Sequence, residues 1–268
     1  MSTTPETYTH GHHESVLRAH RWRTAENSAP HLLSLLEPAM SVLDVGCGPG
    51  TITIDLAARV SPGRVLGIDA SQEVVDQAAS AAASTRSTAR FQVGDVYAID
   101  AEDGEFDVVH AHQVLQHLAD PVRALEEMRR VCRPEGIIAV RDADYSSFSW
   151  APLDPGLDRW LELYRRLTRH NGGEPDAGRF LLQWAIDAGC SEVTAGAATW
   201  CFATPEDRRW WGGLWADRTT RSAIATQAIG LGWATRDDLE AIADSWRRWS
   251  DQPGGWFAVL HGEVIARP

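Results

Sequence analysis

The sequence predicts an α/β protein with a doubly wound, mainly parallel sheet of seven strands and helical insertions in its C-terminal third. Three observations predict this fold class. Apolar, strand-like segments alternate with helix-like segments between residues 41 and 144, which is typical of a parallel sheet covered by helices on both faces. A loop with alternating glycines follows the first strand-like segment. Beyond residue 144 the alternation ends and tryptophans become frequent.

The alternating region predicts five strands in succession along the chain. They are expected at residues 41–45, 64–69, 89–93, 106–111 and 136–141. Helices are expected between them at residues 51–60, 71–84 and 121–131. Ser71 is a suitable N-cap for the second helix, because its hydroxyl can accept a hydrogen bond from a backbone N–H of the first turn. Pro134 and Gly136 are expected to end the third helix.

The two ends of the chain flank this region. Residues 1–40 are predicted to form an N-terminal helical arm, since Asn27–Pro30 has the composition of a helix start. Residues 41–144 are expected to form the cofactor-binding core. Residues 145–268 are expected to complete the sheet and to carry the helical insertions. Within them, strands are expected at 192–202 and 256–265, and helical segments at 157–168, 175–188 and 205–250.

Composition and charge limit the class of protein. The formal net charge of −12 argues against a nucleic-acid or anionic-membrane partner, because a polyanion repels an acidic protein. The four cysteines are far apart and have no metal-like spacing, which favours reduced thiols in a cytosolic protein. No segment approaches the roughly 20 apolar residues of a membrane helix. These observations predict a soluble, cytoplasmic protein that binds neither nucleic acid nor membrane.

The segment of residues 42–51 is the most informative part of the chain. Glycines alternate at Gly46, Gly48 and Gly50, and Asp44 stands two residues before the first of them. Glycine lets the backbone turn tightly and approach a ligand closely. In an open α/β sheet the end of a strand is the usual position of a cofactor. The spacing differs from the Gly-x-Gly-x-x-Gly of dinucleotide folds, and no Gly-Lys-Ser/Thr of a phosphate-binding loop follows.

These residues resemble the class I S-adenosylmethionine-dependent methyltransferases, most closely the small-molecule enzymes of ubiquinone and menaquinone biosynthesis. Asp44–Gly50 is similar to the family's first motif, Asp69 ends the second strand, and Asp95 follows the third. The resemblance implies a Rossmann-like fold in which Asp69 holds the ribose hydroxyls and Asp95 meets the adenine amino group. A carboxylate suits the ribose because it accepts two hydrogen bonds at once. The implied contacts of S-adenosylmethionine are Tyr8, Arg23, Asp44, Gly46, Cys47, Gly48, Asp69, Ala70, Gly94, Asp95, Val96, His112, Gln113 and His117.

The resemblance also implies an activity. The enzyme would move a methyl group from S-adenosylmethionine to a small, hydrophobic or aromatic acceptor, through an oxygen, nitrogen or carbon atom. Such a transfer depends mainly on alignment of the reactants and on exclusion of water. Two alternatives stay open at this point. One is a cofactor-binding regulator of the same fold without turnover, and the other is an NAD-dependent oxidoreductase.

Three side chains are candidate catalytic groups. A base is needed only where the acceptor atom holds a proton, as in an alcohol or a phenol. His112 follows the fourth predicted strand, Tyr145 follows the fifth, and His170 lies in the C-terminal insertion. Asp142 and Asp144 share the location of Tyr145.

The distribution of the twelve tryptophans is uneven, because all except Trp22 lie between Trp150 and Trp256. They indicate a tryptophan-rich core, an aromatic-lined acceptor pocket, or both. The acceptor pocket and part of a homodimer contact are expected from Trp150, Trp160, Trp184, Trp200, Trp210, Trp211 and Trp215.

A histidine-rich stretch near the N-terminus contains His10, His12, His13 and Glu14. These residues lack the second cluster of ligands that a closed metal site requires, so we expect no metal. We interpret the arm as a lid in which Tyr8 and the neighbouring histidines fold over the cofactor, since closure would shield the sulfonium from water.

Overall fold

A sheet of eight strands runs through the molecule, which a computed structural model describes for residues 22–268. The strands follow one another as β1 (Val42–Val45), β2 (Val65–Asp69), β3 (Arg90–Val93), β4 (Phe106–His112), β5 (Cys132–Ala143), β6 (Ser149–Ala151), β7 (Ser191–Phe202) and β8 (Trp256–Arg267). Their spatial order is β3-β2-β1-β4-β5-β8-β6, and β7 also pairs with β8. The strands β1 to β5 are mutually parallel, whereas β6, β7 and β8 join by antiparallel pairing. The predicted α/β fold with a mainly parallel sheet is confirmed.

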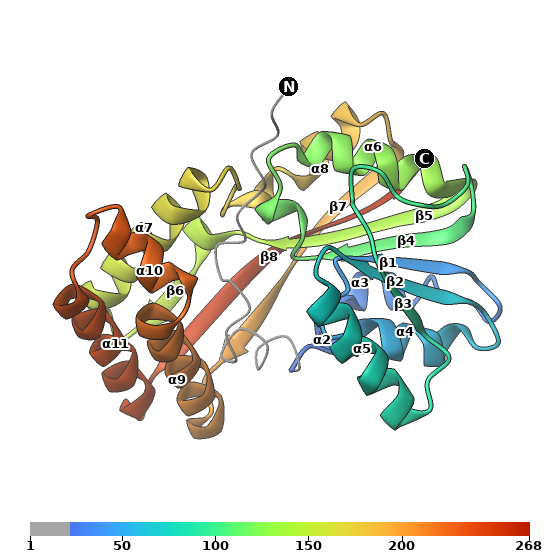
Figure 1. Ribbon diagram of the computed structural model, residues 1–268. Coiled ribbons are helices and arrows are strands. Elements are labelled where there is room, and N and C mark those ends of the chain that lie inside the picture. The colour runs from blue at the N-terminus through green and yellow to red at the C-terminus, as the bar shows by residue number, and fades with distance from the viewer. Residues whose placement is uncertain (1–21) are drawn as a thin grey trace.

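Seven of these strands are the predicted ones, and β6 is an addition that the sequence did not reveal. Its three residues are too few to carry an alternating pattern. The long strand β8 gives β6 its place in the sheet. Residues 256–258 of β8 pair with β6, residues 261–266 pair with β5, and β7 runs along nearly the whole of β8. One strand therefore extends from the sheet into the helical region at the left of Figure 1.

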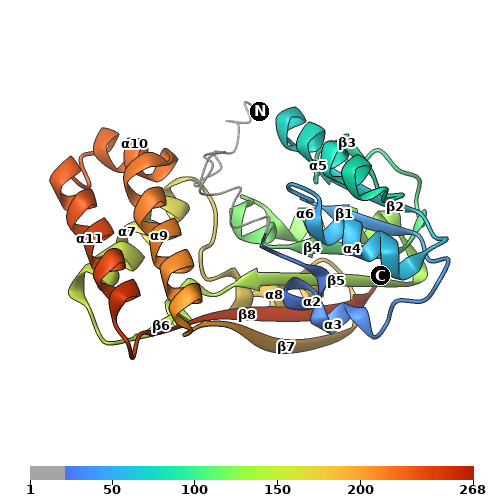
Figure 2. The ribbon, with the colours of Figure 1, turned by 90° about the horizontal axis from the view of Figure 1, so that it is seen from below.

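Helices cover both faces of the sheet, as expected for a doubly wound fold (Figures 1 and 2). One face carries α2 (Ala25–Ser28), α3 (Pro30–Leu33), α4 (Thr51–Val60) and α5 (Gln72–Thr85). The opposite face carries α6 (Pro121–Val131) and α8 (Leu181–Asp187). Two apolar cores result, since side chains of β1 and β4 alternate between the faces. Val42 and Val108 pack on the α4 side, while Leu43 and Val109 pack on the α6 side.

Most predicted element boundaries agree with the structure to within a few residues. The helix α4 has the predicted bounds, and the hydroxyl of Ser71 accepts a hydrogen bond from the backbone of α5. Two segments differ. Strand β5 begins at Cys132 because Cys132 pairs with Phe106 of β4, and a register shift leaves residues 133–136 without a partner residue in β4. The predicted 175–188 helix is divided into the 3-10 turn η3 (Ala177–Arg179) and α8.

The C-terminal helices form a bundle beyond the end of the sheet (Figure 2). They are α7 (Pro155–His170), α9 (Pro205–Arg221), α10 (Ala223–Gly230) and α11 (Arg236–Asp251). Their core is aromatic. Trp160 and Trp246 meet edge to face with ring centroids 4.8 Å apart, and both pack near Phe257 of β8. No helix within residues 22–268 combines the length and apolar composition needed to cross a bilayer.

Candidate active site

A cavity of about 1180 Å³ lies where the carboxyl ends of β1, β2 and β4 approach the helical bundle. Common small-molecule pockets measure about 300–1,000 Å³, so this one has room for a cofactor and a second small molecule. Its glycine-loop half is lined by residues 44–49, 51–52, 68–71, 74, 93–98, 100, 118–120 and 123. Its tryptophan half is lined by Trp22, Arg23, Gln116, Tyr145, Phe148, Trp200, Trp210, Trp211, Trp215, Arg218 and Val259. The junction between the halves consists of His112, Gln113, Val114 and His117.

The glycine loop turns sharply between β1 and α4. Gly46, Gly48 and Gly50 have φ angles of +66°, +55° and +82°, a left-handed conformation that glycine adopts without strain. A Cβ at Gly46 would also lie 2.4 Å from the Cγ2 atom of Val114. The positive φ angles and the lack of space for a Cβ at Gly46 explain why glycines recur in this loop. The loop can then bring its backbone to a ligand at the N-terminus of α4.

Asp44 holds the base of this loop. Its carboxylate is buried and accepts hydrogen bonds from the Thr53 hydroxyl at 2.5 Å and from Nδ1 of His110 at 2.7 Å. Thr53 belongs to α4, and His110 stands beside Asp44 in the parallel pairing of β1 with β4. The acid therefore ties the strand before the loop to the helix after it.

Asp69 is held at the carboxyl end of β2 by backbone donors. The N–H of Gly48 donates to its Oδ2 atom at 3.1 Å, and the N–H of Ser71 donates to its Oδ1 atom at 3.0 Å. Each carboxylate oxygen can accept more than one hydrogen bond, so both retain capacity for a pair of hydroxyls. Asp95 follows β3 and is exposed, and its Oδ1 atom accepts from the N–H of Tyr97 at 2.9 Å.

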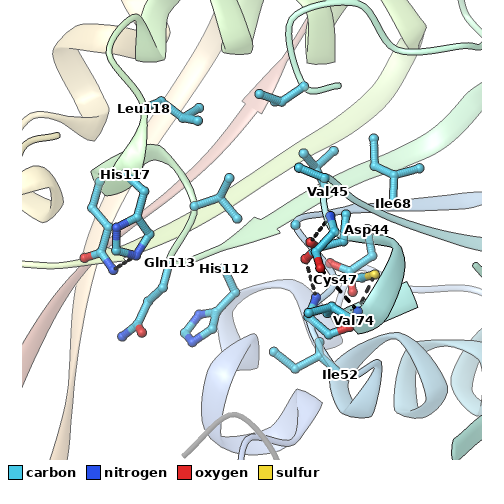
Figure 3. A pocket seen from close by; sticks show the side chains of 18 of the residues that line it. Asp44, Val45, Cys47, Ile52, Ile68, Val74, His112, Gln113, His117 and Leu118 are labelled. Carbon is cyan, nitrogen blue, oxygen red and sulfur yellow. Dashed lines mark hydrogen bonds between the residues drawn. The ribbon is translucent and has the colours of Figure 1, made fainter. Parts of the chain in front are cut away.

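Uncharged histidines occupy the junction. Figure 3 shows His112 and Gln113 between the Asp44–Cys47 turn and His117. Burial, together with the positive charges of Arg23 and Arg141, holds the pKa of His112 well below its usual value. Burial and the charge of Arg23 lower the pKa of His117 to about 3. Both imidazoles are therefore neutral near pH 7.

Gln113 links the junction to the N-terminal segment and to β8. It follows β4 with a φ angle of +54°, and its side-chain oxygen accepts a hydrogen bond from Arg23. Its amide nitrogen lies 2.9 Å from Nε2 of His261. This arrangement fixes where the guanidinium of Arg23 enters the tryptophan half.

The tryptophans divide between the core of the bundle and the wall of the cavity. Trp22 packs against Trp200 and Trp210, with ring centroids 5.1 Å and 5.2 Å away. These rings line the cavity together with Trp211 and Trp215. The other three candidates do not line the cavity. Trp160 is buried in the bundle core, Trp150 stacks on Phe257, and Trp184 stacks on Phe180.

The structure brings nearly all the cofactor candidates together. The predicted residues that line the cavity are Arg23, Asp44, Gly46, Cys47, Gly48, Asp69, Ala70, Gly94, Asp95, Val96, His112, Gln113 and His117. Tyr8 lies outside the described residues, as do His10, His12, His13 and Glu14. Within the described part of the chain, no group of three or more metal-ligating side chains is arranged to hold an ion.

The catalytic candidates separate. His112 and Tyr145 line the cavity. His170 does not line it. It is exposed at the C-terminal end of α7, and its ring meets Trp233 edge to face at 5.2 Å. Asp142 and Asp144 also lie off the cavity lining.

Sequence reasoning missed two polar residues of the tryptophan half, Gln116 and Arg218. Gln116 lies in the 3-10 turn η1 (Leu115–His117), which the sequence did not predict. A signal for Arg218 was present. Trp211, Trp215 and Arg218 are spaced by four and three residues within a predicted helical segment, which puts them on one helix face.

A family model described as a methyltransferase domain matches residues 36–204. The chain belongs to the methyltransferase family. The methyltransferase is 34% identical to an uncharacterised methyltransferase of Schizosaccharomyces pombe, with 96% of this chain and 95% of that one covered. It is 35% identical to the demethylmenaquinone methyltransferase of Lactococcus lactis over 47% of this chain and 48% of that one. The family inferred from the glycine loop, Asp69 and Asp95 is thereby confirmed.

Solved structures share the fold of the methyltransferase. The YcgJ protein of Bacillus subtilis matches with a TM-score of 0.52 and 22% identity, over 88% of this chain and 98% of that one. The phosphoethanolamine N-methyltransferase 2 of Haemonchus contortus in complex with S-adenosyl-L-methionine matches with a TM-score of 0.54 and 14% identity. The match covers 87% of this chain and 49% of the Haemonchus contortus chain. At these identities the likeness concerns the fold alone.

Proposed function

We propose that this methyltransferase moves a methyl group from S-adenosylmethionine to a small acceptor with an apolar or aromatic body, which binds in the tryptophan half. The observation that carries the proposal is a single cavity that joins the glycine loop to Trp200, Trp210 and Trp211. A donor bound at the loop and an acceptor bound among the indole rings would share one space. Proximity of this kind supplies most of the acceleration that a methyl transfer needs.

The residues of the glycine-loop half fit the donor. Asp69 has lone pairs left for two ribose hydroxyls after its bonds to Gly48 and Ser71. Asp95 stands exposed after β3, where it can accept from the adenine amino group. When bound, S-adenosylmethionine supplies an activated methyl group on a positively charged sulfur. The carboxylates of this half suit that charge.

The junction and the tryptophan half would serve the acceptor. Neither ring nitrogen of His112 has a hydrogen-bond partner among the described residues. Because its pKa is depressed by burial, the neutral ring is available to accept a hydrogen bond from an acceptor hydroxyl. Tyr145 offers a second hydroxyl contact at the cavity wall. The indole rings exclude water from the space between donor and acceptor.

Calorimetry on the full chain tests the donor. We expect S-adenosylhomocysteine, the demethylated product, to bind at one site per chain and NAD⁺ not to bind. Binding of NAD⁺ without binding of S-adenosylhomocysteine would overturn the proposal.

A turnover assay tests the acceptor. Release of S-adenosylhomocysteine should rise on addition of small aromatic or apolar acceptors. Tight cofactor binding with no methylated product from any acceptor class would favour the regulator instead.

A further inference from the structure

Residues 22–29 form a short segment, which we call the N-terminal strap, between α4 and the tryptophan half. On one side, the N–H of Ala25 donates to Oδ2 of Asp55 on α4 at 2.9 Å. On the other side, Trp22 packs against the indole rings of the tryptophan half. Trp22 and Arg23 both line the cavity. The strap therefore supplies part of the wall of the tryptophan half.

Two donors from the sheet meet at one carbonyl group of the strap. Nη1 of Arg141 on β5 donates to the backbone oxygen of Asn27 at 2.7 Å, and Nε1 of Trp200 on β7 donates to the same oxygen at 2.5 Å. This oxygen belongs to the last turn of α2, where carbonyl groups lack partners within the helix. The side-chain amide of Asn27 in turn donates to the backbone oxygen of Trp22 at 3.1 Å. Asn27 thus connects Arg141 to a ring on the cavity wall.

Arg141 is also connected to Arg23. Its Nη2 atom lies 3.3 Å from Nδ1 of His261. The Nε2 atom of His261 lies 2.9 Å from the amide nitrogen of Gln113, which accepts a hydrogen bond from Arg23 through its side-chain oxygen. Both cavity-lining residues of the strap are therefore linked to Arg141, although Arg141 itself does not line the cavity.

Burial of Arg141 calls for a reason beyond packing. Its side chain is 1% exposed, and burial lowers its pKa to about 10 against the opposing effect of Glu263, so it is protonated at neutral pH. Its Nε atom lies 3.4 Å from Oε1 of Glu263. A buried ion pair often contributes no more to stability than apolar side chains of the same volume. A guanidinium, however, can also donate to a backbone carbonyl from another nitrogen. Its bond to the strap is what an apolar residue could not replace.

We propose that Arg141 is a positioning residue of the acceptor site, which fixes the N-terminal strap on the sheet so that Trp22 closes one side of the tryptophan half. This inference rests on the proposed function, because it concerns the acceptor wall of the same cavity. The glycine loop is held by separate contacts, those of Asp44 and Asp69. Loss of Arg141 should therefore disturb the acceptor side and leave the donor side in place.

Hydrogen exchange of the full chain tests the bond to the strap. The double variant Arg141→Met/Glu263→Gln removes the donor without leaving a buried carboxylate unpaired. We expect its hydrogen-bonded strap amides to exchange at least about tenfold faster than in the wild type, the value of one charge-assisted hydrogen bond. The amides of α5 should exchange as before.

The single variant Glu263→Gln is the matched control, because it breaks the ion pair and keeps the donation from Arg141 to Asn27. Its strap amides should exchange within about threefold of the wild-type rate. Unchanged strap exchange in the double variant, or equal acceleration in both variants, would overturn the proposal.

Ligand affinity connects the strap to the cavity. Calorimetry measures binding of S-adenosylhomocysteine, and then of 3-phenylpropionate as a small aromatic probe to the chain saturated with S-adenosylhomocysteine. The double variant should bind the probe about fivefold more weakly, through loss of an ordered aromatic contact. Its affinity for S-adenosylhomocysteine should stay within about threefold of the wild type. Equal losses for the two ligands would mean a general structural role and would contradict the proposal.

Asn27→Ala replaces the double variant if that protein does not fold. It removes the side-chain bond to the backbone of Trp22 and leaves Arg141 beside Glu263. Faster strap exchange with unchanged affinity for S-adenosylhomocysteine would support the proposal, and unchanged exchange would contradict it. Failure of the wild type to bind S-adenosylhomocysteine would count against the proposed function itself. If the wild type binds S-adenosylhomocysteine and not the probe, the exchange rates alone decide whether Arg141 positions the strap.

Discussion

The glycine-loop half and the tryptophan half of the cavity are built in different ways. The first is local: Gly46, Asp69 and Asp95 each lie at the carboxyl end of a parallel strand, and backbone N–H groups nearby hold the two carboxylates in place. The second is assembled from distant segments, with Trp22 before α2, Trp200 on β7 and Arg218 on α9. This difference teaches that the donor site we propose depends on the sheet, whereas the acceptor site we propose depends on how the bundle docks against the sheet.

The largest expected effect concerns the stability of the helical bundle. Trp246 is fully buried and packs against Trp160, Trp249 and Phe257. Trp246→Ala should lower the free energy of unfolding by about 3–5 kcal/mol because it removes a large side chain from a filled core. Urea denaturation measures the change. Trp256→Ala, at a position that is 41% exposed, should cost less than about 1 kcal/mol. Equal losses in the two variants would contradict a bundle core centred on Trp246.

The second prediction concerns the glycine-loop half. Asp69→Ala should weaken binding of S-adenosylhomocysteine by at least about 100-fold, since two hydrogen bonds to a charged group would be lost. Affinity is measured by calorimetry. Asp76→Ala is the control, because Asp76 is an exposed acid on the adjacent helix α5. Retained affinity in Asp69→Ala would place the ribose elsewhere.

The third prediction concerns the pH dependence that buried Asp142 gives to the stability of the protein. Burial raises the pKa of Asp142 to about 8 in the folded protein, against about 3.9 in an unfolded chain. The unfolded state therefore loses its proton first as the pH rises. The stability contributed by protonated Asp142 is complete below about pH 4 and is lost progressively up to about pH 8, at no more than about 1.4 kcal/mol per pH unit.

Asp142→Asn isolates this effect, since the amide keeps the size of the side chain and cannot ionise. Unfolding free energies of both proteins are measured from pH 4 to pH 9. The wild type should fall steadily relative to the variant between about pH 4 and pH 8, after which the difference should stay constant. Parallel curves over this range would mean that Asp142 is ionised in the folded state.

The smallest expected effect concerns ligand affinity in the tryptophan half. Trp210 lines the cavity and packs against Trp22. Trp210→Ala should weaken binding of 3-phenylpropionate by about tenfold through loss of an aromatic contact, with little change for S-adenosylhomocysteine. Trp233→Ala is the control because Trp233 does not line the cavity. A larger loss of cofactor affinity than of probe affinity would remove the division between the halves.

The same division explains what the sequence could predict. Asp69 and Asp95 were found because a carboxylate directly after an apolar strand is visible in the pattern itself, and parallel strands bring such positions to one edge. Arg218 was missed because only the docking of α9 against β7 brings it to the cavity wall. The position of His170 could not be predicted for the same reason, since the packing of α7 places its ring against Trp233.

The continuous strand β8 has a mechanical consequence. Its first residues pair with β6 beside the bundle and its later residues pair with β5 of the sheet, while β7 braces its other edge. No flexible connection interrupts this ladder at the boundary between the two regions. The sheet edge beside the bundle is therefore continuous with the centre of the sheet, and a movement of α9 or α11 relative to the sheet has to take place in the loops at residues 203–204 and 252–255 that join these helices to β7 and β8.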